Sequence, residues 1–207
     1  MSESARRQSV YQRVLGDRFG ELDEKLQVYF GMPPAGTVGA GSGMYDEAGS
    51  RLRWLRPVWA WLAWRRVLFP EHGRDVPFSV VNTPDARGGL RARRTFEFPR
   101  RRRVMVDRMS VVETADGPAL HDRLGRRGGL EVRLRLDVVD GGLTMLSERL
   151  WLRVAALRVP LPRIARVTLT ERTDGDRQRV DVRIHLPLLG EVFVYRGTFT
   201  YDYRSIS

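Results

Sequence analysis

The histidines and serines are the residues whose chemistry could support proton transfer or nucleophilic attack. His72, His121 and His185 lie far apart in the chain, and no HExxH or HxH spacing occurs. Cysteine is absent, which excludes disulfides, thiolate nucleophiles and cysteine-ligated metals. Ser42 lies in GAGSG, which departs from the G-x-S-x-G nucleophile elbow, so we interpret it as part of a flexible strand edge. We therefore expect no catalytic residues, no metal site and no cofactor.

Several acids fall in strand-like segments and could meet inside a curled sheet, where buried carboxyl pairs acquire perturbed pKa values. They are Glu97, Asp107, Glu148 and Glu171. We interpret them as partners in exposed cross-strand ion pairs. His121 and Asp122 are adjacent, so on a strand they point to opposite faces.

Arginine accounts for all but one of the 36 basic residues, and the net charge is +11. Such a surface can attract nucleic acid, anionic lipid or acidic partners, although many of these arginines alternate with apolar residues as on a solvated face. The run from Arg100 to Arg103 is interpreted as the charged tip of a hairpin. Beside it, only Phe96 and Phe98 come close to aromatic stacking platforms, so nucleic-acid binding is not expected.

Residues 50–69 form the most unusual segment, a helix rich in tryptophan and arginine. It contains Trp54, Trp59, Trp61 and Trp64, together with Arg51, Arg53, Arg56, Arg65 and Arg66, and no acid. Tryptophan favours the water–lipid interface, and adjacent arginines favour an anionic leaflet.

An alternative is that these tryptophans cover the sheet or line the mouth of its cavity, because an amphipathic helix must bury its apolar face. The two interpretations can coexist in a lipid-binding cup. Trp59 and Trp61 lie about 200° apart on a helix, so the tryptophans cannot all point one way. We take Trp54, Trp59, Trp61, Trp64, Arg51, Arg53 and Arg56 as the candidate ligand- or membrane-facing residues.

The elements that position these residues follow from periodicity. Residues 9–30 carry an apolar stripe of helical spacing, which Gly16 and Gly20 could divide into two short helices, and residues 1–8 are expected to be a disordered tail. The glycine-rich segment 36–50 is interpreted as a kinked strand and a loop.

From residue 74 to residue 203 the apolar period is two, most clearly over residues 130–138, and the DGG segment at 140–142 indicates a hairpin. About ten strands joined by short turns must form an antiparallel sheet. We expect one α+β domain over residues 1–207, in which the sheet curls into a barrel, half-barrel or cup with the N-terminal helices packed on it.

Four segments carry a family resemblance: YQRVLGDRFGELDEKLQVYFG, FPEHGRDVPFSVVN, DRLGRRGGLEVRLRLDVVDGGLTM and LRVPLPRIARVTLTERTDGDRQRVDVRIHLPLLGEVFVYRGTF. Over residues 9–203 they resemble the bacterial family known as domain of unknown function 4166. The resemblance is most specific in the Pro-Leu-Pro turn at residues 160–162 and in the segment LPLLGEVFVYRG. Members of that family stand alone or follow saccharopine-dehydrogenase-like, Rossmann-type proteins. The resemblance implies no catalytic residues.

These observations favour a non-enzymatic protein that binds an apolar or amphipathic, lipid-like molecule between sheet and helices. Residues 51–69 are expected to contact anionic membrane. The resemblance implies an alternative, a domain that partners a Rossmann-type reductase or epimerase, and an interaction or scaffolding module is a third. The longest uncharged apolar run, Pro57–Trp64, is eight residues, too short to span a bilayer. We expect a cytoplasmic protein, peripheral to the inner membrane face.

Overall fold

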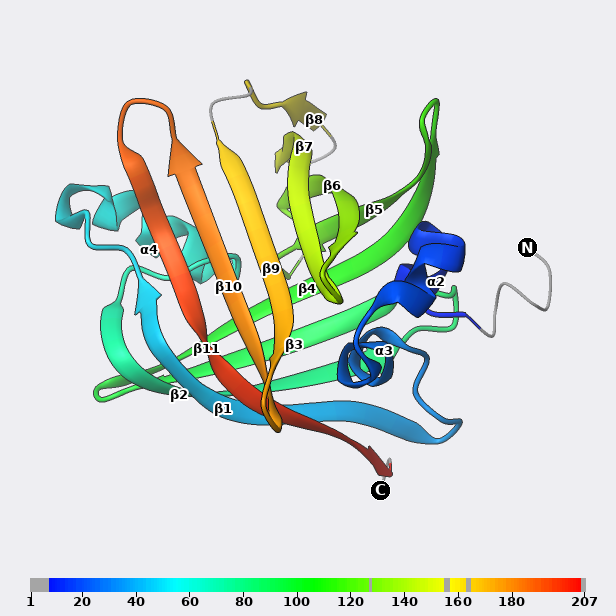
Figure 1. The fold of residues 1–207 in the computed structure, drawn as a ribbon. Helices are drawn as coiled ribbons and strands as arrows, with labels where there is room; N and C mark the ends of the chain where they lie inside the picture. The colour runs from blue at the N-terminus through cyan, green and yellow to red at the C-terminus, as the bar shows by residue number, and fades with distance from the viewer. Residues whose placement is uncertain (1–7, 127, 155–156, 163–164, 206–207) are drawn as a thin grey trace.

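The computed structural model describes residues 8–126, 128–154, 157–162 and 165–205, which form a closed antiparallel β-barrel of ten strands (Figure 1). The barrel strands are β1 (Thr37–Gly49), β2 (His72–Pro84), β3 (Leu90–Phe98), β4 (Arg101–Thr114), β5 (Gly117–Leu124), β6 (Leu130–Val139), β7 (Gly142–Val154), β9 (Arg166–Asp174), β10 (Arg177–Leu186) and β11 (Gly190–Ser205). The short strand β8 (Leu157–Pro160) pairs with the end of β7. The predicted α+β fold with a curled sheet of about ten strands is confirmed.

Two pairings close the barrel. The first and last strands meet, with Gly43 of β1 opposite Phe199 of β11. β7 pairs on one side with β6 and on the other with β9, where Met145 lies opposite Leu169. At the predicted hairpin between β6 and β7, Asp140 and Gly141 both adopt positive φ, 50° and 74°, the pattern of a type I′ turn.

The glycine-rich segment is β1, a central strand between β2 and β11, so the expected flexible edge at Ser42 is wrong. Gly41 and Gly43 alternate with Ser42, and a Cβ on either glycine would meet the Phe199 side chain of β11. At Gly43 that Cβ would also lie 2.1 Å from the Thr198 carbonyl oxygen. The absence of side chains therefore lets the Phe199 ring lie across β1.

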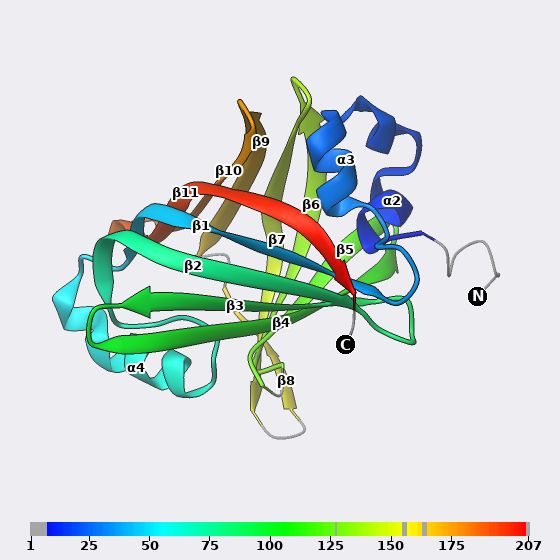
Figure 2. The ribbon, with the colours of Figure 1, turned by 90° about the horizontal axis from the view of Figure 1, so that it is seen from below.

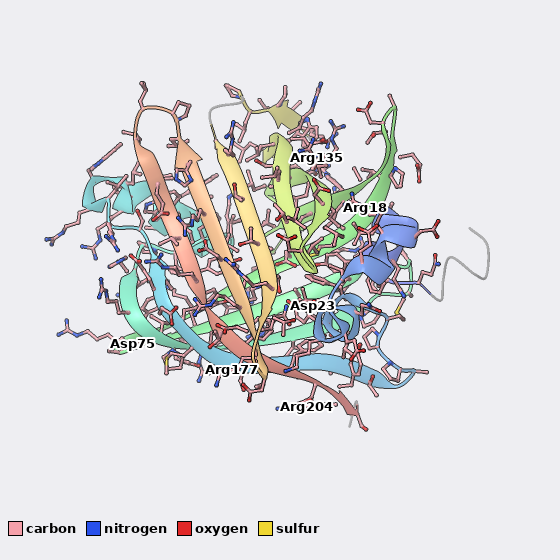
Figure 3. All side chains as sticks on the ribbon, viewed as in Figure 1. Arg18, Asp23, Asp75, Arg135, Arg177 and Arg204 are labelled. Atoms are coloured by element: carbon pink, nitrogen blue, oxygen red, sulfur yellow. The ribbon has the colours of Figure 1, made fainter. Side chains whose placement is uncertain are left out.

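Three short helical segments cover one end of the barrel: α2 (Val10–Leu15), the 3₁₀ segment η1 (Gly16–Glu21) and α3 (Glu24–Phe30) (Figure 2). Ser9 and Gln12 form a reciprocal capping box that starts α2. The Tyr29 ring packs edge-on against Tyr201 of β11, with ring centroids 4.6 Å apart. Arg18 pairs with Asp137 at 2.9 Å, and the Asp23 amide donates to the Gly141 carbonyl, which fixes this cap to the β6–β7 hairpin (Figure 3).

The opposite end is covered by η2 (Arg53–Leu55), α4 (Arg56–Trp64) and residues 67–69. Trp59 of α4 lies 5.7 Å from the Phe193 ring, and Phe69 lies 4.7 Å from the Phe96 ring. The helix is shorter than the predicted range of 50–69. It ends because Arg66 adopts a left-handed φ of 61°, with Arg66 N donating to Ala63 O and Val67 N to Leu62 O, the hydrogen bonds of a Schellman motif.

Candidate functional site

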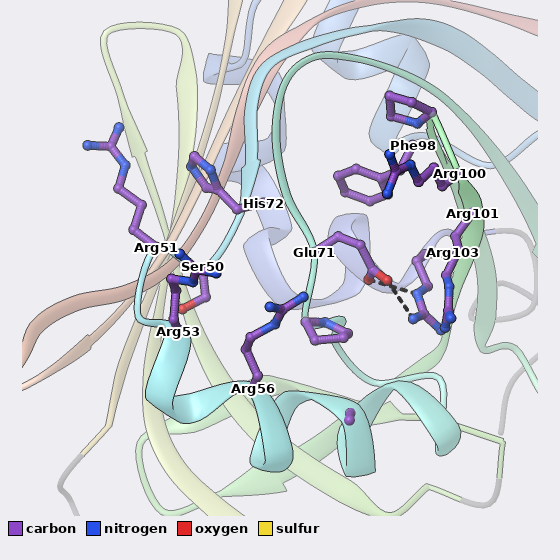
Figure 4. Close-up of a pocket in the computed structure, with 13 residues that line it drawn as sticks. Ser50, Arg51, Arg53, Arg56, Glu71, His72, Phe98, Arg100, Arg101 and Arg103 are labelled. Carbon is purple, nitrogen blue, oxygen red and sulfur yellow. Dashed lines mark hydrogen bonds and ion pairs between the residues drawn. The ribbon is translucent and has the colours of Figure 1, made fainter.

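A cationic cleft of about 930 Å³ lies between α4 and the hairpin that joins β3 to β4 (Figure 4). We define the cationic cleft by its lining residues Ser50, Arg51, Arg53, Arg56, Ala60, Pro70, Glu71, His72, Phe98, Pro99, Arg100, Arg101 and Arg103. The predicted hairpin tip supplies one wall, since β3 ends at Phe98 and β4 starts at Arg101. The tryptophan- and arginine-rich segment supplies the other wall.

Carboxylates balance only part of this charge. Glu71 accepts two hydrogen bonds from Arg103, at 2.7 and 2.6 Å (Figure 4). Glu47 accepts one from Arg51 at 2.7 Å. Within the described part of the chain, no carboxylate forms an ion pair with the other arginines of the cleft. These are Arg53, Arg56, Arg100 and Arg101, and all four are exposed. The cleft therefore presents unbalanced positive charge to solvent.

Glu47 organises one side of this cleft from a buried position. Its carboxylate accepts hydrogen bonds from Arg51 and Arg196 and pairs with the His72 ring at 2.9 Å. Burial raises the pKa of this carboxyl, but the hydrogen bonds from His72 and Arg51 outweigh it and lower the pKa to about 2. Glu47 is therefore ionised at neutral pH and holds Arg51 at the rim.

Helix α4 presents three distinct faces. Its buried face packs Trp59 on the barrel, and Arg56 and Ala60, one turn apart, face the cleft. The third face carries an aromatic stripe that begins in η2 and continues along α4. It consists of Trp54 of η2 and of Val58, Trp61 and Trp64 of α4, spaced by four and three residues. Its members are 62%, 50%, 41% and 76% exposed. The guanidinium of Arg65 lies 4.4 Å from the centre of the Trp61 ring, so cationic and aromatic groups meet there.

The candidate residues named from the sequence thus divide into two groups. Arg51, Arg53 and Arg56 line the cationic cleft, and Trp54, Trp61 and Trp64 are exposed beside it. Trp59 is only 6% exposed and belongs to the barrel core. One tryptophan therefore covers the barrel, and the other three face outward, where contact with a ligand or membrane stays a prediction.

A second polar cluster lies inside the barrel. Arg94 of β3 forms an ion pair with Asp107 of β4, and Gln178 of β10 donates to Glu171 of β9. Asp122 of β5 is 8% exposed and lies close enough to Asp107 for their charges to interact. Three buried carboxyl groups thus face one guanidinium.

The excess of buried carboxyl groups over guanidinium groups favours the protonated form of these carboxyls. Burial raises the pKa of Glu171 to about 8, and Arg94 only partly opposes it. Burial raises the pKa of Asp122 well above its usual value, and the neighbouring Asp107 raises it further. One oxygen each of Asp107 and Asp122 is buried without a hydrogen-bond partner among the described residues. Glu171 is therefore mainly protonated at neutral pH.

The interior leaves little free space. A void of about 10 Å³ lies beside Arg94 and Glu171 and is bordered by Tyr29, Tyr45 and Tyr195. Such a volume suits about one water molecule and is far too small for a lipid chain. Tyr45 stacks on Phe78 with ring centroids 3.8 Å apart, so aromatic side chains fill the space that a ligand would need.

The interpretation of four acids as exposed ion-pair partners is wrong for two of them. Glu97 and Glu148 do pair with Arg102 and Arg133, at 2.7 and 2.9 Å. Asp107 and Glu171 instead are only 6% and 5% exposed.

The sequence held a signal for this interior cluster. Asp107 lies between Met105 and Met109 on alternate positions, and Glu171 continues the alternation of Val167 and Leu169. Residues two apart share a strand face, so both acids occupy core positions. Phe96 and Phe98 are also buried, which removes them as stacking platforms.

The sequence is similar to known proteins over most of its length. Among the described residues, no helix combines the length and the apolar character that crossing a membrane requires. No solved structure matches the chain. It is 26% identical over 205 residues to the uncharacterised protein YndH of Bacillus subtilis strain 168, a match that covers 95% of this chain and 98% of YndH. The model of the family described as "Domain of unknown function (DUF4166)" matches residues 22–199, and this chain therefore belongs to that family.

Proposed function

We propose that this protein binds an anionic amphiphile, with the charged head in the cationic cleft and the apolar part against the aromatic stripe of α4. The single observation that carries this proposal is the cleft of about 930 Å³, which has arginines on both walls. Among the described residues, four of these arginines form no ion pair with a carboxylate. A lipid-like molecule would then lie between helix and sheet, outside the barrel interior.

The chemistry of the head group follows from the donors. Guanidinium groups form forked hydrogen bonds to carboxylates and phosphates, and they hold these bonds best where water is partly excluded. Arg56 approaches from α4, while Arg100 and Arg101 approach from the hairpin tip (Figure 4). An anion between these walls would contact arginines from both.

The apolar part has a surface next to this cleft. Trp64 is 76% exposed and Trp54 is 62% exposed, although each could be buried with a gain in free energy. Indole rings suit the boundary between acyl chains and water, because their N–H groups remain hydrated. Contact with an anionic membrane surface is the form of this proposal in which the amphiphile remains in its bilayer.

The barrel interior has no space for a wholly apolar ligand, so we propose an amphipathic ligand that binds outside the barrel. A void of about 10 Å³ bordered by Arg94 and Glu171 does not admit an acyl chain. A Rossmann-type protein partner remains a prediction, with no observation among the described residues that favours a particular surface for it.

The test uses dodecanoate below its micelle concentration, with the uncharged dodecyl maltoside as the matched ligand. The cleft variant carries Arg53→Glu, Arg56→Glu and Arg100→Glu. The control variant carries Arg91→Glu, Arg135→Glu and Arg204→Glu, three exposed positions that give the same change in net charge. Tryptophan fluorescence reports binding.

We expect dodecanoate to bind wild type and control within about threefold of each other, and the cleft variant at least about 100-fold more weakly, because three charge-assisted contacts are lost. Dodecyl maltoside should bind all three proteins equally weakly. Equal loss in the cleft and control variants would show that net charge alone attracts the ligand, and the proposal would be wrong.

A further inference from the structure

A second cationic hollow of about 400 Å³ lies on the outer face of the barrel, over β5, β6 and β7. We call it the flank site and define it by Val112, Glu113, Thr114, His121, Arg123, Glu131, Arg133, Trp151, Arg153 and Arg158. None of these residues lines the cationic cleft. Neither the sequence prediction nor the proposed amphiphile site makes use of it.

The floor of the flank site is Glu131, whose side chain is only 2% exposed although it faces outward from β6. Its Oε1 accepts from Arg153 Nη1 at 3.1 Å and from Arg123 Nη2 at 3.3 Å. Its Oε2 accepts from Arg158 Nε at 2.7 Å. One buried carboxylate therefore orients three guanidinium groups around a common point.

Two further contacts stiffen this arrangement. The Arg158 guanidinium lies 4.0 Å from the centre of the Trp151 ring, which holds that side chain flat against the sheet. The His121 ring lies 3.2 Å from Glu131 and edge-on to Trp151. Burial lowers the pKa of His121, and Arg158 and Arg123 add to this against the pull of Glu131, so the ring is neutral at pH 7 and adds no charge.

The charges of the flank site do not cancel. Three guanidinium groups meet the single carboxylate of Glu131, which leaves two positive charges. Arg133 is paired with Glu148, and the exposed carboxylate of Glu113 at the rim lowers the net charge of the whole hollow to +1. The side chains of Arg123, Arg153 and Arg158 are 36%, 32% and 45% exposed, so part of each fork faces solvent.

We propose that the flank site binds a phosphate dianion, the phosphomonoester of a small water-soluble molecule. A dianion matches the two positive charges that Glu131 leaves uncompensated among its three arginine partners. Its three terminal oxygens can accept from the guanidinium N–H groups that do not bind Glu131. The carboxylate beneath the arginines offsets their mutual repulsion and so holds the three cations together. The hollow of about 400 Å³ leaves room for a small organic group beside the phosphate.

The experiment measures binding of inorganic phosphate and of phenyl phosphate by isothermal titration calorimetry. Arg153→Gln removes one fork and leaves Glu131 with two arginine partners, so the fold is retained, which a thermal melt verifies. Arg158→Lys keeps the charge and removes the fork. Arg135→Gln, at an exposed position on the same outer face of β6, is the matched control.

We expect Arg153→Gln to weaken phenyl phosphate binding at least about tenfold, the effect of losing one charge-assisted hydrogen bond, and Arg158→Lys to weaken it by a similar factor. Arg135→Gln should stay within about twofold of wild type. Equal binding by wild type, Arg153→Gln and Arg135→Gln would overturn the proposal, since the cluster would then serve only to neutralise Glu131.

A lipid phosphate presents the same chemistry, so a second arm uses vesicles of a zwitterionic lipid, phosphatidylcholine, to which phosphatidic acid is added. If Arg153→Gln reduces vesicle binding but leaves phenyl phosphate binding unchanged, the claim of a water-soluble ligand is wrong. The cleft variant should retain phenyl phosphate affinity within about twofold, which separates this site from the amphiphile site.

Discussion

At the scale of single residues, the interior carboxyl of Glu171 has the most consequential environment. It lies on β9 beside Gln178 and shares Arg94 with Asp107. Buried carboxyls with one shared cation are costly to ionise, and such groups commonly mark functional sites. Here the tyrosine-lined void next to Glu171 has room for about one water molecule.

The raised pKa of Glu171 predicts that Glu171→Gln stabilises the protein in mild base. The folded-state pKa is about 8 and the ordinary value is 4.5, so the folded form holds a proton that the unfolded form has released between these values. Wild-type stability is therefore lost as pH rises from about 4.5 to 8. Urea unfolding should show the variant more stable by on the order of a few kcal/mol at pH 8.5 and equal to wild type at pH 4.

Glu97→Gln is the control for this prediction, because Glu97 is half-exposed and paired with Arg102. It should change stability by less than about 1 kcal/mol at either pH. A stability gain for Glu171→Gln that is the same at pH 4 and pH 8.5 would show that Glu171 does not retain its proton in the folded barrel.

Glu47 predicts the opposite dependence on pH. Its folded-state pKa is about 2 against an ordinary 4.5, so its contribution to stability is present above about pH 4.5 and is lost as pH falls toward 2. Glu47→Gln should therefore lower the free energy of unfolding at pH 7, by on the order of 2 kcal/mol, and converge with wild type near pH 2. Urea titrations at both pH values measure this, and a deficit that persists at pH 2 would mean that the ion pairs of Glu47 contribute nothing.

The sequence contains more information about the barrel interior than the interpretation of its acids as exposed ion-pair partners used. Residues two positions from an apolar strand residue share its face, so Asp107 and Glu171 were readable as core positions from Met105 and Leu169. Apolar alternation along a strand does not predict which acids from different strands lie close together. Arg94, Asp107 and Glu171 come from β3, β4 and β9, and only closure of the barrel brings them to one place.

At the scale of elements, α4 divides its residues between the barrel core and the exposed aromatic stripe. Trp59 is buried against Phe193, whereas Trp64 contributes to the exposed stripe. Trp59→Ala should therefore lower the free energy of unfolding by about 3–5 kcal/mol, and Trp64→Ala by less than about 0.5 kcal/mol. Chemical denaturation of the two variants provides the measurement.

The same pair of variants separates the two roles of the helix. Trp64→Ala should reduce dodecanoate affinity while stability stays unchanged, because its ring is lost from the aromatic stripe. If Trp64→Ala destabilises the protein as much as Trp59→Ala, the stripe belongs to the core and the division of faces is wrong.

Strands were more predictable than helix ends. Period-two alternation and the DGG turn gave β6 and the start of β7, because both signals are local. The end of α4 was missed since Arg66 occupies a left-handed position that glycine normally fills. The hydrogen bond from Val106 N to Arg66 O ties this turn to β4, a tertiary contact that no local pattern reports.

At the scale of the whole molecule, the choice among barrel, half-barrel and cup was open because all three share the same alternation. Closure depends on β7, whose first half pairs with β9 and whose second half pairs with β8. That division places β8 outside the barrel and lets β9 complete it. The interior is then filled by rings such as Tyr45 and Phe78, a packing outcome that periodicity cannot supply.

The structure shows where on the surface part of the net charge of +11 lies. Arginines line the cationic cleft and the flank site, and a third hollow is lined by Arg91, Arg93, Arg108, Arg123 and Arg126. Attraction of an anionic membrane should depend on the cationic cleft and should weaken as salt shortens the Debye length from its value of about 10 Å at 0.1 M.

Co-sedimentation with anionic vesicles at 0.05 M and 0.5 M salt is the most direct measurement of cleft-mediated binding, with wild type, the cleft variant and the control variant compared side by side. Each arginine near such a surface contributes about 1 kcal/mol, so reversing three in the cleft should abolish sedimentation at low salt. Wild type and control should sediment at 0.05 M salt and be released at 0.5 M. If all three proteins sediment equally, or if wild type stays in the supernatant at low salt, the cationic cleft and α4 do not bind anionic amphiphiles in a membrane.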